Sequence, residues 1–180
     1  MRRTHLLNEN WVFTYFGESK TEINIPHTWN NIDGQDGGND YRRGTCIYEK
    51  DFSTPEYSES ECVYLEFAGV NASAKVILND QEIMTHDGGY STFRCDITQY
   101  LKSENHLKVE VDNSVNDRVY PQKADFTFYG GIYRDVSIIC VSESHFDLDY
   151  YGTPGLKVTP EVCGKDAKIE IEAFVTNAKL

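Results

Sequence analysis

Apolar and polar residues alternate along much of this chain, and no other sequence feature limits its fold as strongly. In residues 107–112, Leu, Val and Val occupy the odd positions and Lys, Glu and Asp the even ones. Residues 72–79 and 135–141 show the same period of two. This period places one face of a strand on a core. No segment keeps a helical period, so the sequence predicts an all-β fold.

Short strands separated by turn residues predict an antiparallel β-sandwich. Asn79-Asp80, between two apolar runs, predicts a tight hairpin turn. Asp96, with Gln99 three residues later, predicts a capped helical turn through Leu101. The strands expected in this first part are 12–16, 46–52, 62–67, 72–79, 82–85, 92–95, 107–112 and 135–141.

Turn and breaker residues at 150–155 predict a boundary before the end of the chain. Two further strand-like runs follow, at 156–162 and 168–176. Two strands do not form a stable sheet alone, so we expect the chain to end inside a second β-domain. The expected division is a first domain at 1–143 and a partial second domain at 144–180.

The formal net charge of −12 excludes several classes of partner. Nucleic acids and anionic membranes require a cationic face, and no Lys/Arg cluster supplies one, whereas a neutral sugar is compatible. No apolar run approaches the ~20 residues that cross a bilayer. The five scattered Cys, without CxxC spacing, predict reduced thiols rather than a zinc site. We expect a cytoplasmic protein; a periplasmic protein with its signal peptide removed is the alternative.

Several short motifs occur in an order that resembles family 2 glycoside hydrolases, which include β-galactosidases, β-glucuronidases and β-mannosidases. The matches cover nearly all of residues 5–142. They include Pro26-His27-Thr28-Trp29-Asn30, Tyr41-Arg42-Arg43-Gly44, Tyr48–Phe52, His86–Tyr90, Asp112-Asn113 and, most recognisable, Gly130–Val136. The resemblance implies a jelly-roll-like sandwich, similar to galactose-binding domains, that serves as a sugar-binding domain. It also implies that an immunoglobulin-like β-domain begins after it and that a TIM barrel bears both catalytic carboxylates.

The resemblance implies a non-catalytic accessory module of a retaining, β-galactosidase-like hydrolase, which completes the substrate pocket of that barrel. Retaining hydrolysis needs two carboxyl groups about 5–5.5 Å apart on a rigid scaffold. A TIM barrel alone takes about 250 residues, so this chain is expected to be inactive alone and to contain no catalytic residue. A free-standing lectin-like carbohydrate-binding module and a purely structural spacer are the alternatives.

The expected partners are a β-glycoside substrate and the TIM barrel of the same polypeptide, and the sequence leaves homo-oligomer contacts open. We expect no cofactor for this chain itself. The resemblance implies that the parent enzyme uses a monovalent cation or Mg²⁺.

Asp125 is the sharpest hypothesis about a single residue. The resemblance to β-galactosidases implies that it reaches into the barrel's active site and helps hold the sugar and a monovalent cation; the alternative is a solvated loop carboxylate. Tyr41, Arg42 and Arg43 lie in the other loop that can face a barrel. An Arg there either pairs with a barrel carboxylate or an acidic substrate, or forms a surface ion pair, which we favour.

Phe128 belongs to the aromatic run 126–129, which either lines a sugar site or packs against the missing barrel. We therefore expect an exposed aromatic patch at these residues. Trp29 is interpreted as an anchor of its loop on the core rather than as a sugar platform. The Gly130–Val136 motif is interpreted as structural. His27 and His86 are expected to form loop hydrogen bonds rather than to bind metal.

Overall fold

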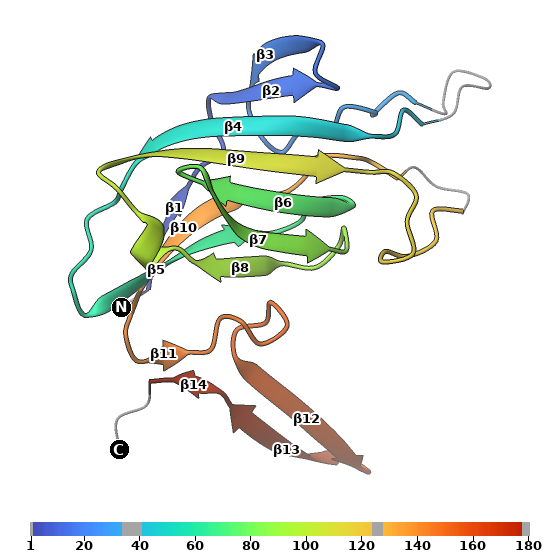
Figure 1. Ribbon diagram of the computed structural model, residues 1–180. Helices are drawn as coiled ribbons and strands as arrows, with labels where there is room; N and C mark the ends of the chain where they lie inside the picture. Colours follow the sequence, from blue (N-terminus) through green and yellow to red (C-terminus); the bar gives the residue numbers. More distant parts are fainter. Residues whose placement is uncertain (1, 34–40, 124–127, 178–180) are drawn as a thin grey trace.

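The computed structural model describes residues 2–33, 41–123 and 128–177. Within them the chain forms strands and one short 3₁₀ turn, so the predicted all-β fold is confirmed. Two antiparallel sheets face each other (Figure 1). The larger contains, in spatial order, β3 (Ser19–Ile23), β2 (Trp11–Tyr15), β4 (Thr45–Ser53), β9 (Glu104–Asp112), β6 (Ser73–Leu78) and β7 (Gln81–Asp87). The smaller contains β1 (Arg3–Leu6), β10 (Val136–Ser142), β5 (Glu61–Phe67) and β8 (Phe93–Asp96).

The alternating apolar residues of both sheets meet in one core. In β9 every second side chain is buried, and its partner β4 presents Cys46, Tyr48 and Phe52 to the same interior. β10 is buried on both faces. Its outward face is covered because Leu148, from the segment after the sandwich, packs with Tyr64, Ile139 and Val141. The segment that follows the sandwich thus covers the outer face of β10.

Two local predictions can be compared directly with the structure. Asn79 and Asp80 have φ values of 52° and 69°, which confirms the tight turn between β6 and β7. The expected helical turn is the 3₁₀ turn η1 (Thr98–Tyr100), whose first residue donates through its amide to Asp96 at 2.9 Å. All five cysteines are free thiols, as predicted. No described segment is a helix with the length and hydrophobicity needed to span a membrane.

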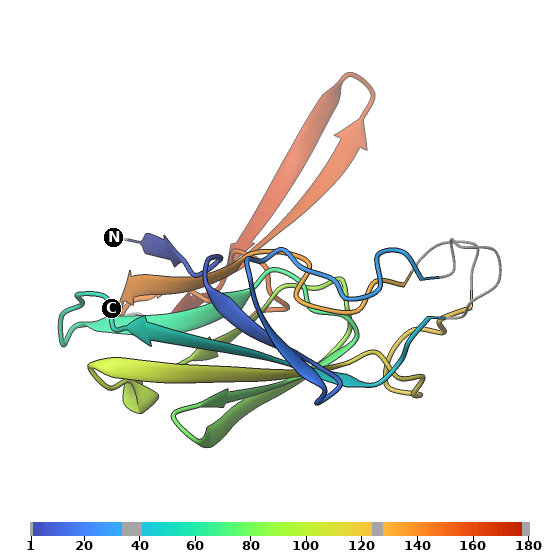
Figure 2. The same ribbon diagram turned by 90° about the horizontal axis from the view of Figure 1, so that it is seen from above.

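The C-terminal part forms two small two-stranded sheets, and the expected boundary after residue 143 falls between β10 and β11 (His145–Phe146). β11 pairs with β14 (Val175–Thr176), and β12 (Leu156–Cys163) pairs with β13 (Asp166–Ala173) in a ribbon that projects from the sandwich (Figure 2). The single run expected at 168–176 is split at Phe174. Its amide still donates to Gly155, just before β12, whereas its carbonyl accepts from Asp147, just after β11, so the chain changes partner at this residue.

The β12–β13 ribbon has one apolar face and one polar face. Lys157 and Glu172 form an ion pair of 2.6 Å on the polar face. The apolar side chains are largely exposed, with Val162 at 76% and Ile169 at 60%. The register places on the apolar face Leu156, Val158, Pro160, Val162, Ala167, Ile169, Ile171 and Ala173.

Arg94 of β8 fixes the linker between the sandwich and the ribbon. Its Nε lies 2.5 Å from the carboxylate of Glu66 on the neighbouring strand β5. Its Nη1 donates to the carbonyl oxygens of Leu148 and Thr153, at 2.8 and 3.1 Å. The Arg94 side chain is only 7% exposed, so loss of its charge would leave Glu66 without its closest partner in a largely desolvated position.

Replacing Arg94 by Gln is expected to lower the free energy of unfolding by about 3 kcal/mol, because one partner of a buried ion pair is removed. Urea denaturation measures this change. The matched control is Arg118→Gln, which breaks a pair with Asp87 whose arginine is 60% exposed; its cost should stay below about 1 kcal/mol. Equal effects of the two substitutions would contradict the role given to Arg94.

Candidate functional site

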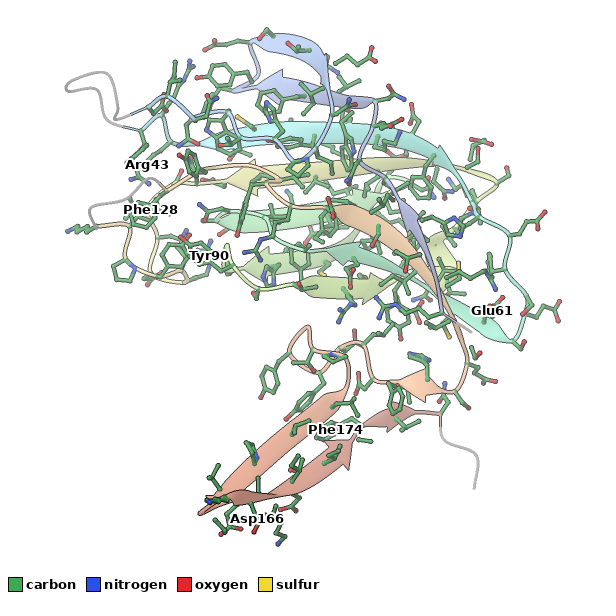
Figure 3. The ribbon with its side chains drawn as sticks, turned by 180° about the vertical axis from the view of Figure 1, so that it is seen from behind. Arg43, Glu61, Tyr90, Phe128, Asp166 and Phe174 are labelled. Carbon is green, nitrogen blue, oxygen red and sulfur yellow. The ribbon has the colours of Figure 1, made fainter. Side chains whose placement is uncertain are left out.

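The candidate site lies at one end of the sandwich, where loops from distant parts of the sequence converge. Figure 3 shows Arg43, Tyr90 and Phe128 along this end. The segments that meet there are 26–30, 41–44, 113–123 and 128–134. We call this region the loop end.

Main-chain hydrogen bonds join Gly130–Val136, the most recognisable motif of the sequence, to the Pro26–Asn30 motif. The amide of His27 donates to the carbonyl of Ile132 at 2.8 Å, and the amide of Trp29 donates to the carbonyl of Gly130 at 3.3 Å. On the other side, Gly131 forms a bridge with Asn71, with N–O distances of 3.0 and 3.1 Å. The glycine motif therefore lies between two other segments and is bonded to both.

Asn30 completes this connection from inside the molecule. Its fully buried amide accepts from the backbone N–H of Gly130 at 2.7 Å and donates to the carbonyl of Phe128 at 3.1 Å. The hydroxyl of Thr28 donates to the carbonyl of Gly130 at 2.8 Å. A buried amide that satisfies backbone groups of a distant loop fixes the position of that loop.

Gly130 and Gly131 are required by space and by backbone conformation. A Cβ atom on Gly131 would lie 2.5 Å from the carbonyl oxygen of His27 and 2.7 Å from the Tyr48 hydroxyl, and its φ is +130°. A Cβ on Gly130 would overlap the indole of Trp29. The structural interpretation of this motif is confirmed.

Trp29 anchors its loop, as predicted. Its ring stacks on Phe13 with centroids 6.3 Å apart and meets Phe16 edge-on at 6.0 Å. Its Nε1 donates to the carbonyl of Arg42 at 3.3 Å. The indole thus ties the 26–30 segment both to the core strand β2 and to the 41–44 segment.

The two histidines are held by hydrogen bonds, as expected. His27 Nδ1 lies 2.9 Å from the Tyr48 hydroxyl, and its ring lies 4.6 Å from that of Phe13. His86 Nε2 lies 3.1 Å from the carbonyl of Gly88. Burial lowers the pKa of both rings. Among the described residues, no group of three or more Cys, His, Asp or Glu side chains is arranged to hold a metal.

Arg42 occupies a surface pair, which was the favoured alternative to a ligand role. Its Nη2 lies 2.6 Å from Glu18, and its guanidinium carbon lies 4.4 Å from the ring centres of both Tyr15 and Phe16. The hydrogen bond to Glu18 raises the pKa of Arg42. Tyr41 is half-buried, with its ring centre 5.7 Å from the guanidinium carbon of Arg43. A substrate contact by either residue stays a prediction.

Arg43 points into the loop end instead. Its Nη1 donates to the carbonyl of Asn113 at 3.2 Å and to the side-chain oxygen of Gln122. Asn113 accepts from the amide of Gly44 at 2.9 Å and donates to the carbonyl of Arg42 at 3.1 Å, so the arginine loop is held at several points. Sequence reasoning missed Gln122, because nothing in its local sequence distinguishes it from a loop glutamine.

The expected exposed aromatic patch is wrong for Phe128. This residue is 3% exposed, so it offers no free ring face to a sugar. The amide of Asn30 holds its carbonyl, and its ring stacks against Tyr120 at 6.0 Å inside the loop end. The exposed rings are Tyr129, at 40%, and Tyr90, at 53%. Asp125 and Phe126 lie outside the described residues.

Gly131→Ala is expected to lower the free energy of unfolding by about 2–4 kcal/mol, because the new Cβ meets a strained φ and two fixed atoms. Gly164→Ala is the matched control, since Gly164 also has a positive φ, of +67°, but nothing lies within 4 Å of the added atom. It should cost only about 1 kcal/mol. Chemical denaturation of both variants checks the difference, and similar losses would show that space at Gly131 is not limiting.

The buried His27 predicts a dependence of stability on pH. Because burial lowers the pKa of His27 in the folded chain below the ordinary value of 6.5, the unfolded chain binds the proton more readily. The free energy of unfolding should therefore fall as the pH decreases from about 7 to 5.5, a range above most carboxylate titration. His27→Gln should flatten part of this slope, with His86 responsible for another part. His5→Gln, at an exposed position, is the control; an unchanged slope in His27→Gln would contradict the assignment.

Comparison with known proteins gives the family. Residues 39–142 match the sugar binding domain of the glycosyl hydrolases family 2. A β-glucuronidase of Bacteroides fragilis is 35% identical over 98% of this chain and 26% of that protein. A β-galactosidase of Thermoanaerobacter pseudethanolicus is 30% identical over 89% of this chain and 23% of that protein.

Solved structures agree with this match. An FMN-binding β-glucuronidase from Faecalibacterium prausnitzii is 43% identical with a TM-score of 0.91, covering 99% of this chain and 29% of that chain. A β-glucuronidase from Bacteroides uniformis is 32% identical with a TM-score of 0.87, covering 98% and 22%. The chain thus spans about a quarter of the length of these proteins. Because the family match covers more than half of the chain and the fold agrees along its whole length, this chain belongs to glycosyl hydrolases family 2, of which it contains the sugar binding domain.

Proposed function

We propose that this chain is the non-catalytic, substrate-pocket-completing module of a retaining glycoside hydrolase that cleaves β-linked glucuronides. The observation that supports this most is the match of nearly the whole chain, in sequence and in fold, to part of β-glucuronidases. The loop end supplies a physical basis, because polar groups from four separate segments converge there on a rigid scaffold.

The proposal and the sequence-based expectation differ in the sugar that the parent enzyme would cleave. That expectation favoured a β-galactosidase-like parent. The three β-glucuronidases named above are 35%, 43% and 32% identical to this chain, whereas the β-galactosidase is 30% identical. A glucuronide differs from a galactoside in having a carboxylate, so the two choices require different groups in the pocket.

Several parts of the proposal concern the whole protein. The catalytic carboxylates would be on a TIM barrel of the same polypeptide, which the loop end would face. Asp125 would hold the sugar and a monovalent cation there, and the protein would be cytoplasmic. No cofactor is proposed for the module itself.

Activity assays test the proposal. The full-length protein and the 180-residue chain would each be assayed with 4-nitrophenyl β-glucuronide, β-galactoside and β-mannoside. We expect activity only in the full-length protein, with kcat/KM for the glucuronide at least about tenfold above the others, since a site built for a carboxylate penalises substrates that lack it. Turnover by the chain alone would refute a non-catalytic role. A preference for the galactoside would refute the choice of sugar.

A further inference from the structure

Gln122 holds a buried hydrogen-bond donor for which the described part of the chain supplies no acceptor. The residue is 8% exposed, and its side-chain nitrogen has no partner among the described residues. Its side-chain oxygen, in contrast, accepts from Arg43. This contact fixes the orientation of the amide, because a flipped amide would place two donors against each other. A buried donor left unpaired costs about 1–3 kcal/mol, so this position favours a ligand that supplies an acceptor.

Arg43 has unused donors beside the same amide. Its guanidinium has five N–H groups, and within residues 2–33, 41–123 and 128–177 it bonds only the carbonyl of Asn113 and the oxygen of Gln122. No carboxylate of the described chain forms an ion pair with it, whereas Arg3, Arg42, Arg94 and Arg118 each have one. Arg134 also lacks an acidic partner among the described residues, but it is exposed and bonds the carbonyls of Ala68 and Tyr90. Arg43 differs from it in being partly buried, in a chain whose net charge is −12.

The two side chains are positioned before any ligand arrives. Asn113 is 1% exposed and holds the arginine loop through Gly44 and the carbonyl of Arg42. Since the guanidinium is bonded to both Asn113 and Gln122, little side-chain freedom remains to be lost on binding. Adjacent guanidinium and amide N–H groups match the two oxygens of a carboxylate, which accept charge-assisted hydrogen bonds.

An aromatic surface for a sugar ring continues from the same loop. Tyr120, two residues before Gln122, stacks on Tyr90 with centroids 4.9 Å apart. Tyr90 is 53% exposed and lies at the loop end with Arg43 (Figure 3). Aromatic faces beside polar groups favour amphipathic ligands such as sugars over simple anions.

We propose that Arg43 and Gln122 form a binding site for the carboxylate of a uronic acid residue of the glycan, with Arg43 donating from its guanidinium and Gln122 from its side-chain nitrogen. This inference deepens the proposed function and rests on it for the choice of a uronic acid. The site binds the sugar acid and performs no chemical step.

Nuclear magnetic resonance of the ¹⁵N-labelled chain tests the site directly. D-glucuronate, D-glucose and acetate would be titrated at neutral pH while the Gln122 side-chain amide and the Arg43 Nε–H signals are followed. Glucuronate should shift both signals and bind at least about tenfold more tightly than glucose or acetate, which lack the charge or the ring.

Three substitutions complete the test. Arg43→Gln and Gln122→Glu should each weaken glucuronate binding by at least about tenfold, and Gln122→Glu should also raise the stability of the free chain, because it keeps the acceptor for Arg43 and removes the unpaired donor. Lys157→Gln, which breaks the surface pair with Glu172 on the β12–β13 ribbon, should leave binding unchanged. Thermal unfolding checks that each variant is folded.

Either of two results would overturn the site: no shift of these signals with glucuronate, or equal binding of acetate. The activity assay of the full-length protein and this titration can fail independently of each other. An enzyme inactive on glucuronides whose chain still binds glucuronate would refute the proposed function alone, and an active enzyme whose chain does not bind glucuronate would refute the site alone.

Discussion

The close approach of the Gly130-Gly131 backbone to residues 27–30 is the contact on which the loop end depends. It needs two residues without side chains, because Trp29 and the Tyr48 hydroxyl occupy the space that a Cβ would take. It also needs Asn30, whose buried amide bonds the glycine loop from inside. Since Trp29 in turn bonds the loop containing Arg42 and Arg43, one contact sets the positions of three loops at once. The core of the sandwich holds these loops in place, and the loops carry the polar side chains that can contact a ligand.

The sequence predicted the central strands closely and two of the four edge strands of the sandwich, β7 and β8, but it missed the other two, for a physical reason. β4, β6, β9 and β10 bury alternate side chains, so their sequences show the period of two. β1 and β3 were missed, because their side chains are almost all exposed or partly exposed and only main-chain pairing makes them strands. A pattern of hydrophobicity reports burial and not pairing, so a polar edge strand has no such signature.

The same distinction explains the predictions at the site. Trp29 and the glycine motif were interpreted correctly because their roles depend on side-chain size, which is known from the residue type alone. Phe128 was predicted wrongly because a run of aromatic residues in a loop does not indicate which ring is buried. In the structure, the side-chain amide of Asn30 donates to the carbonyl oxygen of Phe128 and holds this residue inside the loop end. Gln122 could not be found at all, since its importance comes from a contact with Arg43, 79 residues away in sequence. Such polar contacts between residues far apart in the sequence can be identified only from the three-dimensional structure.

Polar contacts also govern how the second part of the chain is joined to the first. Arg94 is bonded to Glu66 within the sandwich and to two carbonyl oxygens of the linker, and Leu148 inserts into the outer face of β10. Gly152 lies so close to Thr92 that no side chain would fit between them. The base of the β12–β13 ribbon is therefore rigidly attached, although the ribbon itself has an uncovered apolar face. A two-stranded ribbon has little stability of its own, so its orientation is set at this attachment and not by the ribbon's own pairing.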